Sequence, residues 1–97
     1  MNKLKPPYFA VIFTSTLSNS TSDYAEMASK METLVKDQPG FLGMDHARDT
    51  IGITISYWDS LESIEKWKQN NQHLKAKTLG REKWYASYSL KVCKVLY

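Results

Sequence analysis

Two histidines are the side chains in this sequence best suited to move a proton at neutral pH. His46 alternates with Leu42 and Met44, and His73 lies close behind the polar stretch Asn70-Asn71-Gln72. Because only histidine has an unperturbed pKa near neutral, each is a candidate general base. The two do not form an HxH, HxxxH or HExxH pattern, so the sequence predicts no metal site.

A base needs partners that stabilise the anion it creates and walls that hold a flat substrate. Three Trp, six Tyr and three Phe exceed what a minimal core of 97 residues requires. Arg48 and Arg81 can offset negative charge, and the remaining candidates are hydrogen-bond donors or walls: Tyr57, Tyr85, Tyr88, Trp58, Trp67 and Trp84. Trp67 is also a candidate catalytic residue. Packing is the alternative role for each ring, and Trp67 in particular lies on the apolar stripe of a helix-like segment.

Charge is distributed unevenly along the chain. The total is thirteen basic and ten acidic groups, or +3, but residues 1–65 hold five basic and nine acidic groups, whereas residues 66–97 hold eight basic groups and Glu82. The basic last third either balances acidic neighbours within the fold or forms a rim that attracts an anionic small molecule.

Three features bear on the compartment. A single cysteine, Cys93, excludes an internal disulfide and fits a reducing environment. No apolar run reaches the roughly 18 residues of a membrane span. The apolar stretch 8–13 follows Pro6-Pro7 and is shorter than the h-region of a signal peptide. We therefore expect a cytoplasmic protein with an extended tail over residues 1–7 and one domain over residues 8–97.

The pattern of apolar residues predicts strands and helices in a definite order. Strands are expected over 8–16, 41–48, 53–58 and about 87–96, the first helix after an N-cap at Thr21 or Ser22, and a second after Asp59 or Ser60 with a break near 70–72. In segment 41–48, simple alternation places Leu42, Met44, His46 and Arg48 on one face and Phe41 on the other.

This β-α-β-β-α-β order is that of a ferredoxin-like α+β sandwich, with two helices on one face of a four-stranded antiparallel sheet. Several strands are apolar on both faces, although the helices cover one face alone. A large exposed apolar face is rare on monomers, so we expect a homodimer in which two copies cover each other.

Nucleic-acid binding is a different function that the same topology can serve. An RNA-recognition module needs a basic-Gly-aromatic motif with displayed aromatics on its third strand. Here that strand reads Ile53-Thr54-Ile55-Ser56-Tyr57-Trp58 and lacks the motif. We expect no nucleic-acid partner.

Several segments resemble the antibiotic biosynthesis monooxygenase (ABM) domain family over nearly the whole chain. They are Pro39-Gly40-Phe41-Leu42-Gly43-Met44, Gly52 to Trp58, Ser63 to Lys68 with His73, Leu79-Gly80-Arg81, and Trp84-Tyr85. The resemblance implies a dimeric α+β barrel with a small-molecule cavity between sheet and helices in each subunit. The family includes cofactor-independent oxygenases, quinol oxygenases, haem-degrading enzymes and isomerases.

The haem-degrading branch is the one this sequence departs from. That branch pairs the helix tryptophan, matched by Trp67, with a histidine about three turns later and an asparagine on the first strand. Lys77 stands ten residues after Trp67, and the middle of the first strand offers Ile12, Phe13 and Thr14. What the resemblance then implies is oxidation of an aromatic, polyketide-like or quinol molecule without a cofactor. The alternative is a non-catalytic, small-molecule-binding or stress-related dimer.

Overall fold

A four-stranded antiparallel sheet and a layer of helices make up the computed structural model, which describes residues 4–19 and 21–97. The elements in chain order are β1 (Tyr8–Leu17), α1 (Tyr24–Val35), β2 (Phe41–Arg48), β3 (Gly52–Trp58), α2 (Leu61–Lys68), α3 (Asn71–Leu79), the π-helical turn η1 (Gly80–Trp84) and β4 (Tyr85–Val95). The predicted α+β class, strand number and order of elements are confirmed, and the expected helix break lies between α2 and α3.

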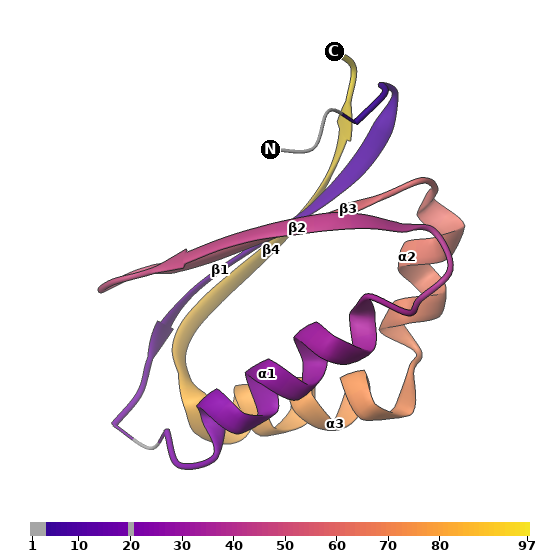
Figure 1. Ribbon diagram of the computed structural model, residues 1–97. Helices are drawn as coiled ribbons and strands as arrows, with labels where there is room; N and C mark the ends of the chain where they lie inside the picture. Colours follow the sequence, from indigo (N-terminus) through magenta and orange to yellow (C-terminus); the bar gives the residue numbers. More distant parts are fainter. Residues whose placement is uncertain (1–3, 20) are drawn as a thin grey trace.

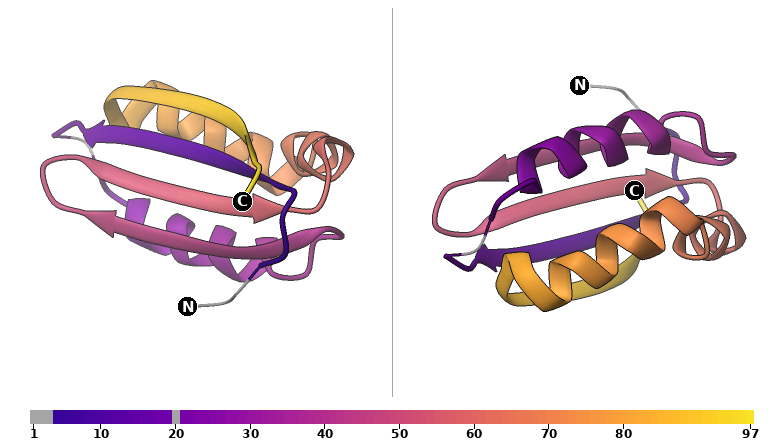
Figure 2. Two further views of the ribbon diagram at one scale, coloured as in Figure 1. Left: turned by 90° about the horizontal axis from the view of Figure 1, so that it is seen from above. Right: turned by 90° about the horizontal axis from the view of Figure 1, so that it is seen from below.

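The strands are arranged in the order β2-β3-β1-β4, so β1 and β3 are central. The sheet twists strongly above the helices, and α2 stands at one end of it (Figure 1). Seen from below, α1 runs under β2 and α3 runs under β4, while β3 and β1 pass above the space between them (Figure 2). No described helix covers the opposite face of the sheet, which we call the open face.

A register shift in β2 changes the face on which its first residue lies. Phe41 pairs with Trp58 and Gly43 with Tyr57, so Leu42 is an extra residue at a bulge. Phe41 therefore shares the helix-covered face with Met44, and the sequence prediction for Phe41 was wrong. Simple alternation holds only after the bulge.

The two connections from a strand into a helix use different caps. The first helix begins after Asp23, whose φ of 67° is left-handed, and not after Thr21 or Ser22 as predicted. The second begins after Ser60, whose Oγ accepts a hydrogen bond from the backbone N–H of Ser63 at 3.1 Å, as one of the two predicted caps.

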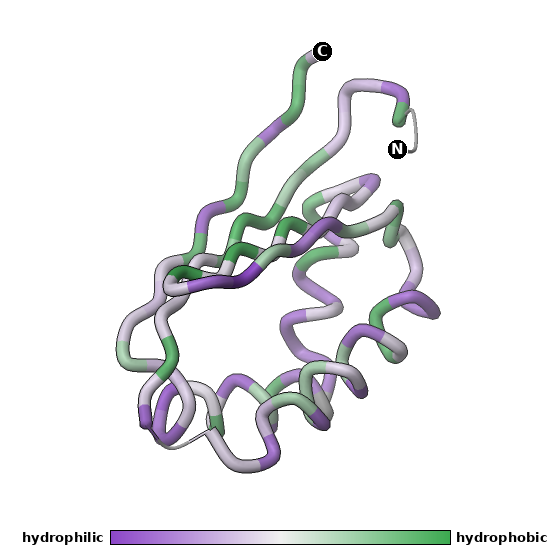
Figure 3. Tube along the Cα trace, turned by 60° about the vertical axis from the view of Figure 1, so that its left-hand side comes forward, coloured by the Kyte–Doolittle hydropathy of each residue, from purple (hydrophilic) through white to green (hydrophobic). Residues whose placement is uncertain are grey.

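The apolar core lies between α2, the end of α1 and the adjacent end of the sheet. Val35, Trp58 and Ile64 are fully buried there, against partly buried rings and aliphatic side chains: Phe9, Val11, Phe41, Met44 and Trp67. Hydrophobic residues recur along the strands, whereas the helices carry many hydrophilic ones (Figure 3). This core is small, and β4 leaves Tyr88, Leu90 and Val92 about half exposed on its helix-covered side.

Candidate functional site

Strand register sorts the helix-covered face into rows that cross the sheet. One row runs from Arg48 on β2 through Gly52 on β3 and Ser15 on β1 to Tyr88 on β4. At the other end of the sheet, Phe41, Trp58 and Phe9 form a row. Gly52 and Trp58 are six residues apart on β3, so the two rows are about 20 Å apart along the strand.

Arg48 reaches across β3 to the central strand. Its Nη2 donates to Oγ of Ser15 at 2.5 Å, and its Nη1 lies 3.4 Å from the Ser15 carbonyl oxygen. A Cβ atom at Gly52 would stand only 2.0 Å from Cζ of Arg48. The missing side chain at Gly52 therefore makes room for the guanidinium, and the buried hydroxyl of Ser15 holds it in place.

Two tyrosines border the Arg48 guanidinium. Cζ of Arg48 lies 5.8 Å from the ring centroid of Tyr24, the first residue of α1. The Tyr24 ring in turn meets Tyr85 edge to face at 5.9 Å. Burial raises the pKa of the Tyr85 phenol, Tyr24 raises it further, and Arg48 opposes the shift. Tyr85 thus keeps its proton at neutral pH and can act as a hydrogen-bond donor.

The turn η1 sets the direction of Tyr85. A Cβ atom at Gly80 would come within 2.5 Å of Cε2 of Tyr85, so the ring lies directly on the glycine. Ser18 anchors this turn to the end of β1, because its Oγ donates to the Lys83 carbonyl at 2.5 Å and its N–H to the Trp84 carbonyl at 2.7 Å. Tyr85 then packs on Phe13 at 5.2 Å, and Phe13 lies 6.1 Å from Tyr88.

A stack of three rings occupies the opposite end of the site. Trp58 and Trp67 have centroids 6.4 Å apart, and Trp67 and His73 lie 4.4 Å apart with planes 13° from parallel. Nδ1 of His73 lies 3.0 Å from the carbonyl oxygen of Trp67. Since a carbonyl can only accept, Nδ1 is the donor and carries the proton in the neutral ring, which leaves the lone pair of Nε2 available.

The surroundings of His73 favour the neutral imidazole. Burial lowers the pKa of His73, its bond to Trp67 acts in the opposite sense, and the charge of Lys77 lowers the pKa further. The pKa of Lys77 is itself lowered by desolvation and by the nearby Arg81 and Lys68. At pH 7 the predicted base is therefore unprotonated and able to accept a proton.

The other predicted residues lie apart from these two groups. Tyr57 is on the open face, where its hydroxyl donates to Oδ2 of Asp45 at 2.7 Å. His46 is exposed on the helix-covered side of β2, two residues before Arg48. Arg81 is exposed on η1. The structure thus groups Trp58, Trp67 and His73 at one end and Arg48, Tyr85 and Tyr88 at the other.

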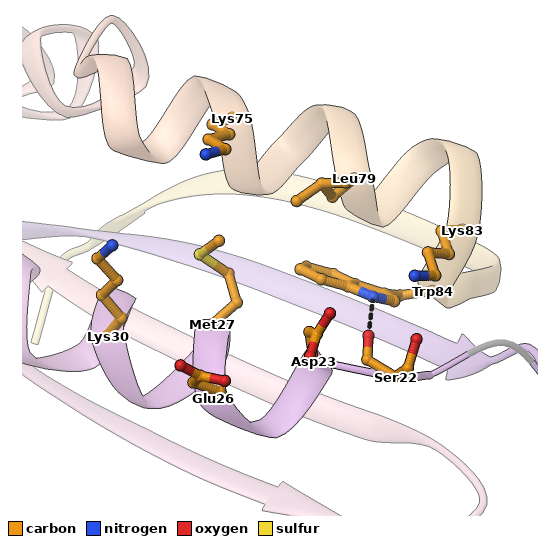
Figure 4. Close-up of a pocket in the computed structure, with 9 residues that line it drawn as sticks. All are labelled: Ser22, Asp23, Glu26, Met27, Lys30, Lys75, Leu79, Lys83 and Trp84. Carbon is orange, nitrogen blue, oxygen red and sulfur yellow. Dashed lines mark hydrogen bonds between the residues drawn. The ribbon is translucent and has the colours of Figure 1, made fainter.

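Trp84 belongs to a groove between α1 and α3. Its Nε1 donates to the carbonyl oxygen of Ser22 at 3.0 Å, and its ring meets Tyr24 edge to face at 5.5 Å. The groove has a volume of about 380 Å³ and is lined by Ser22, Asp23, Glu26, Met27, Lys30, Lys75, Leu79, Lys83 and Trp84 (Figure 4). Trp84 is almost fully buried, so its indole mainly joins the two helices.

Three residues of the Arg48 end were not predicted. Ser15 reads as an ordinary strand residue, Gly52 as part of a hairpin turn, and Tyr24 as part of an apolar stripe. Their proximity depends on the pairing of β1, β2 and β3, which the sequence pattern does not specify to the residue. The small side chains of Ser15 and Gly52 do not distinguish these positions from Ala10 and Ser56 on the same strands.

No group of three or more His, Cys, Asp or Glu side chains within residues 4–19 and 21–97 is placed to hold a metal ion. Over the same residues, no helix is long and apolar enough to span a membrane.

Comparison with known proteins identifies the family. The family model described as antibiotic biosynthesis monooxygenase matches residues 7–79. The chain belongs to the ABM family. The YqjZ protein of Bacillus subtilis (strain 168) is 48% identical over 93 residues, which are 94% of this chain and 82% of that protein.

Solved structures agree with this ABM fold at low sequence identity. A putative antibiotic biosynthesis monooxygenase from Nitrosomonas europaea has a TM-score of 0.81 at 12% identity, covering 99% of this chain and 97% of that one. SnoaB, a cofactor-independent oxygenase from Streptomyces nogalater, has a TM-score of 0.79 at 11% identity, with 95% and 96% covered. Rv0793 from Mycobacterium tuberculosis has a TM-score of 0.82 at 14% identity, with 93% and 96% covered.

Proposed function

We propose that this ABM protein is a small monooxygenase that oxidises an aromatic, polyketide-like or quinol molecule without a cofactor. The observation that carries the proposal is His73, a neutral imidazole stacked at 4.4 Å on Trp67 with its Nδ1 held by the Trp67 carbonyl. Such a group meets the first requirement of the reaction, which is removal of a proton from the substrate. The fold shared with SnoaB, a cofactor-independent oxygenase, supports the same reaction class.

In the proposed reaction, Nε2 of His73 takes a proton from a phenol or an activated methylene. The resulting anion, a carbanion or a phenolate whose charge is delocalised onto carbon, gives one electron to dioxygen, and the substrate radical and superoxide combine to a peroxide on carbon. Protonation and loss of water then convert CH2 and O2 into C=O and H2O, so the substrate supplies all the electrons. Trp67, which is only partly buried, would bind the flat ring system, and Trp58 would support it from the core.

Oxygen consumption tests this proposal. Wild type and the variants His73→Ala, His46→Ala and Trp67→Phe are compared with a panel of quinols and anthrone-like phenols, with Lys36→Gln as a remote surface control. Loss of a general base typically lowers the rate by about 10²- to 10⁴-fold, and we expect this for His73→Ala. If no substrate consumes oxygen above buffer, or if His73→Ala matches wild type, the proposed reaction fails.

Binding without catalysis is the second candidate, and the burial of Trp58 and Trp84 favours it. Trp58 is fully buried in the core and Trp84 is almost fully buried beside α1, so neither indole is free to face a reacting substrate. In that case small aromatic molecules would bind without any oxygen uptake. Calorimetric titration of the same panel, run beside the oxygen assay, separates the two candidates.

The partner and the compartment complete the proposal. The open face carries apolar side chains of three strands, namely Ala10, Ile12, Ile53, Ile55, Cys93 and Val95. Ile53 and Cys93 are exposed on this face in one copy, which supports a homodimer that buries it. The single cysteine supports a cytoplasmic location.

A further inference from the structure

The guanidinium of Arg48 has no acidic partner within the described part of the chain. Ion pairs there join Lys66 to Glu62 at 3.4 Å and Lys68 to Glu65 at 3.6 Å, both on the surface of α2. Arg48 instead donates to the neutral hydroxyl of Ser15. Its positive charge is therefore available to an anion from outside the chain.

The position of this charge is fixed before any ligand arrives. The 2.5 Å bond to Ser15 and the space above Gly52 hold the guanidinium over the central strands. Ordering a free arginine side chain on binding would cost conformational entropy, and this cost is already met by the fold. A guanidinium also has five donors, so the contacts to Ser15 leave others for a ligand.

The neighbours of Arg48 select a flat ligand with an anionic group. Tyr24 lies 5.8 Å from Cζ of Arg48, and Tyr85 stands between Tyr24 and Phe13 at 5.9 and 5.2 Å. Tyr88 extends the wall and is about half exposed. These rings can stack on an aromatic body, while the phenols and the guanidinium can donate hydrogen bonds to an oxyanion.

The separation of Arg48 from the Trp58 end of the sheet indicates which anionic group Arg48 binds. The rows of Gly52 and Trp58 are about 20 Å apart along β3, so Arg48 lies at the opposite end of the sheet from the Trp58, Trp67 and His73 stack. We propose that Arg48, with Tyr24 and Tyr85, anchors a permanently anionic group, a carboxylate, at the far end of an elongated aromatic substrate. This inference rests on the proposed function, because it takes His73 as the reacting end.

Calorimetric titration with 2-naphthoate and its neutral counterpart 2-naphthalenemethanol tests the anchor on the full chain. The variants are Arg48→Gln, Arg48→Lys and, as a control for net charge, Lys36→Gln. A charge-assisted hydrogen bond typically contributes a tenfold or larger change in affinity. We expect Arg48→Gln to weaken 2-naphthoate about tenfold or more, Arg48→Lys to weaken it less, and Lys36→Gln to leave it unchanged. The alcohol should bind wild type and Arg48→Gln equally.

Two results would overturn the anchor. One is equal affinity of wild type, Arg48→Gln and Arg48→Lys for 2-naphthoate, with circular dichroism showing that all are folded. The other is inorganic phosphate displacing 2-naphthoate at equal concentration, since the rings would then contribute nothing. Binding of 2-naphthoate needs neither oxygen nor turnover. A failed binding test therefore rejects the Arg48 anchor alone, and the oxygen-consumption assay still tests the His73 reaction. If wild type binds 2-naphthoate in an Arg48-dependent way but consumes no oxygen with any substrate of the panel, the proposed oxidation is overturned and the anchor stands.

Discussion

The imidazole of His73 lies nearly parallel to the indole of Trp67, with centroids 4.4 Å apart and planes 13° from each other. The histidine comes from the start of α3 and the tryptophan from the end of α2, so the break between these helices brings them together. The same break lets Nδ1 of His73 meet the carbonyl oxygen of Trp67 at 3.0 Å. A continuous helix would place residues six apart on different sides.

This contact predicts a pH dependence of stability. Burial lowers the pKa of His73 below its ordinary value of 6.5, whereas the unfolded chain keeps that value. Between the two pKa values the unfolded chain binds more protons, so the free energy of unfolding should fall as the pH drops below 6.5. Urea unfolding from pH 8 to pH 5 would measure this loss, and His73→Gln should remove most of it.

The exposed His46 provides the matched control. The variant His46→Gln should retain the pH dependence of wild type, because His46 is exposed on the edge strand β2. Parallel stability curves for wild type and His73→Gln would contradict the assignment of a lowered pKa to His73.

Gly80 permits the position of Tyr85. This contact predicts that the effect of Gly80→Ala on the free energy of unfolding depends on whether the Tyr85 ring is present. A Cβ atom at position 80 would lie 2.5 Å from Cε2 of Tyr85, whose ring is confined by Tyr24 and Phe13. Gly80→Ala should therefore destabilise the protein by about 1–3 kcal/mol through overpacking. Chemical unfolding, with near-ultraviolet circular dichroism to follow the tyrosines, measures the effect.

In a Tyr85→Ala background the same substitution has a different result. The clash is removed, and alanine favours helical backbone over glycine by up to about 1 kcal/mol. Gly80→Ala should then be neutral or stabilising. Equal destabilisation in both backgrounds would show that the backbone of η1, and not the Tyr85 ring, requires glycine.

The architecture was predictable because it depends on patterns within single segments. Alternation in 53–58, the helical stripe before Val35 and the polar break near residue 70 each act locally, and each element was found where its pattern indicated it. The bulge at Leu42 was not predictable, since it depends on how β2 pairs with β3 and leaves no clear signature in composition.

The candidate site was predictable in residue types but not in grouping. Histidine, tryptophan and arginine were singled out for their chemistry, and Trp67 and His73 do meet. Arg48 and Ser15 are 33 residues apart and touch only because Gly52 lies between them in the sheet. Such a contact requires the register of three strands, which a single sequence does not determine.

Tyr57 lies on the open face, and the pKa of its phenol can be followed by absorbance. Its hydrogen bond to Asp45 is the main cause that raises the pKa of Tyr57 to about 12, from an ordinary 10.0. Because the raised pKa belongs to the folded state, stability should fall as the pH rises from about 10 to about 12. Asp45→Asn should lower the pKa of Tyr57 in an ultraviolet absorbance titration, whereas Asp49→Asn should not. A titration unchanged by Asp45→Asn would contradict the role of that carboxylate.

The open face is the predicted interface of the homodimer, and Ile55 lies near the centre of this face. Ile55 pairs with Ile12 on β1 and with Asp45 on β2, so it occupies a central strand. A glutamate at this position would place an unpaired charge in the interface, at a cost of several kcal/mol. Light scattering should give wild type twice the 11.2 kDa mass of one chain and Ile55→Glu the single mass.

Leu61→Glu supplies the control for the dimer experiment, because Leu61 is 55% exposed on α2, away from the open face. The same change from an apolar side chain to glutamate there should leave the mass doubled, which separates loss of the interface from a general effect of charge. Wild type at 11.2 kDa under micromolar conditions would show that the chain leaves its open face uncovered. A doubled mass that survives Ile55→Glu would mean that the two copies meet elsewhere, and the half-exposed helix-covered side of β4 is then the next apolar surface to mutate.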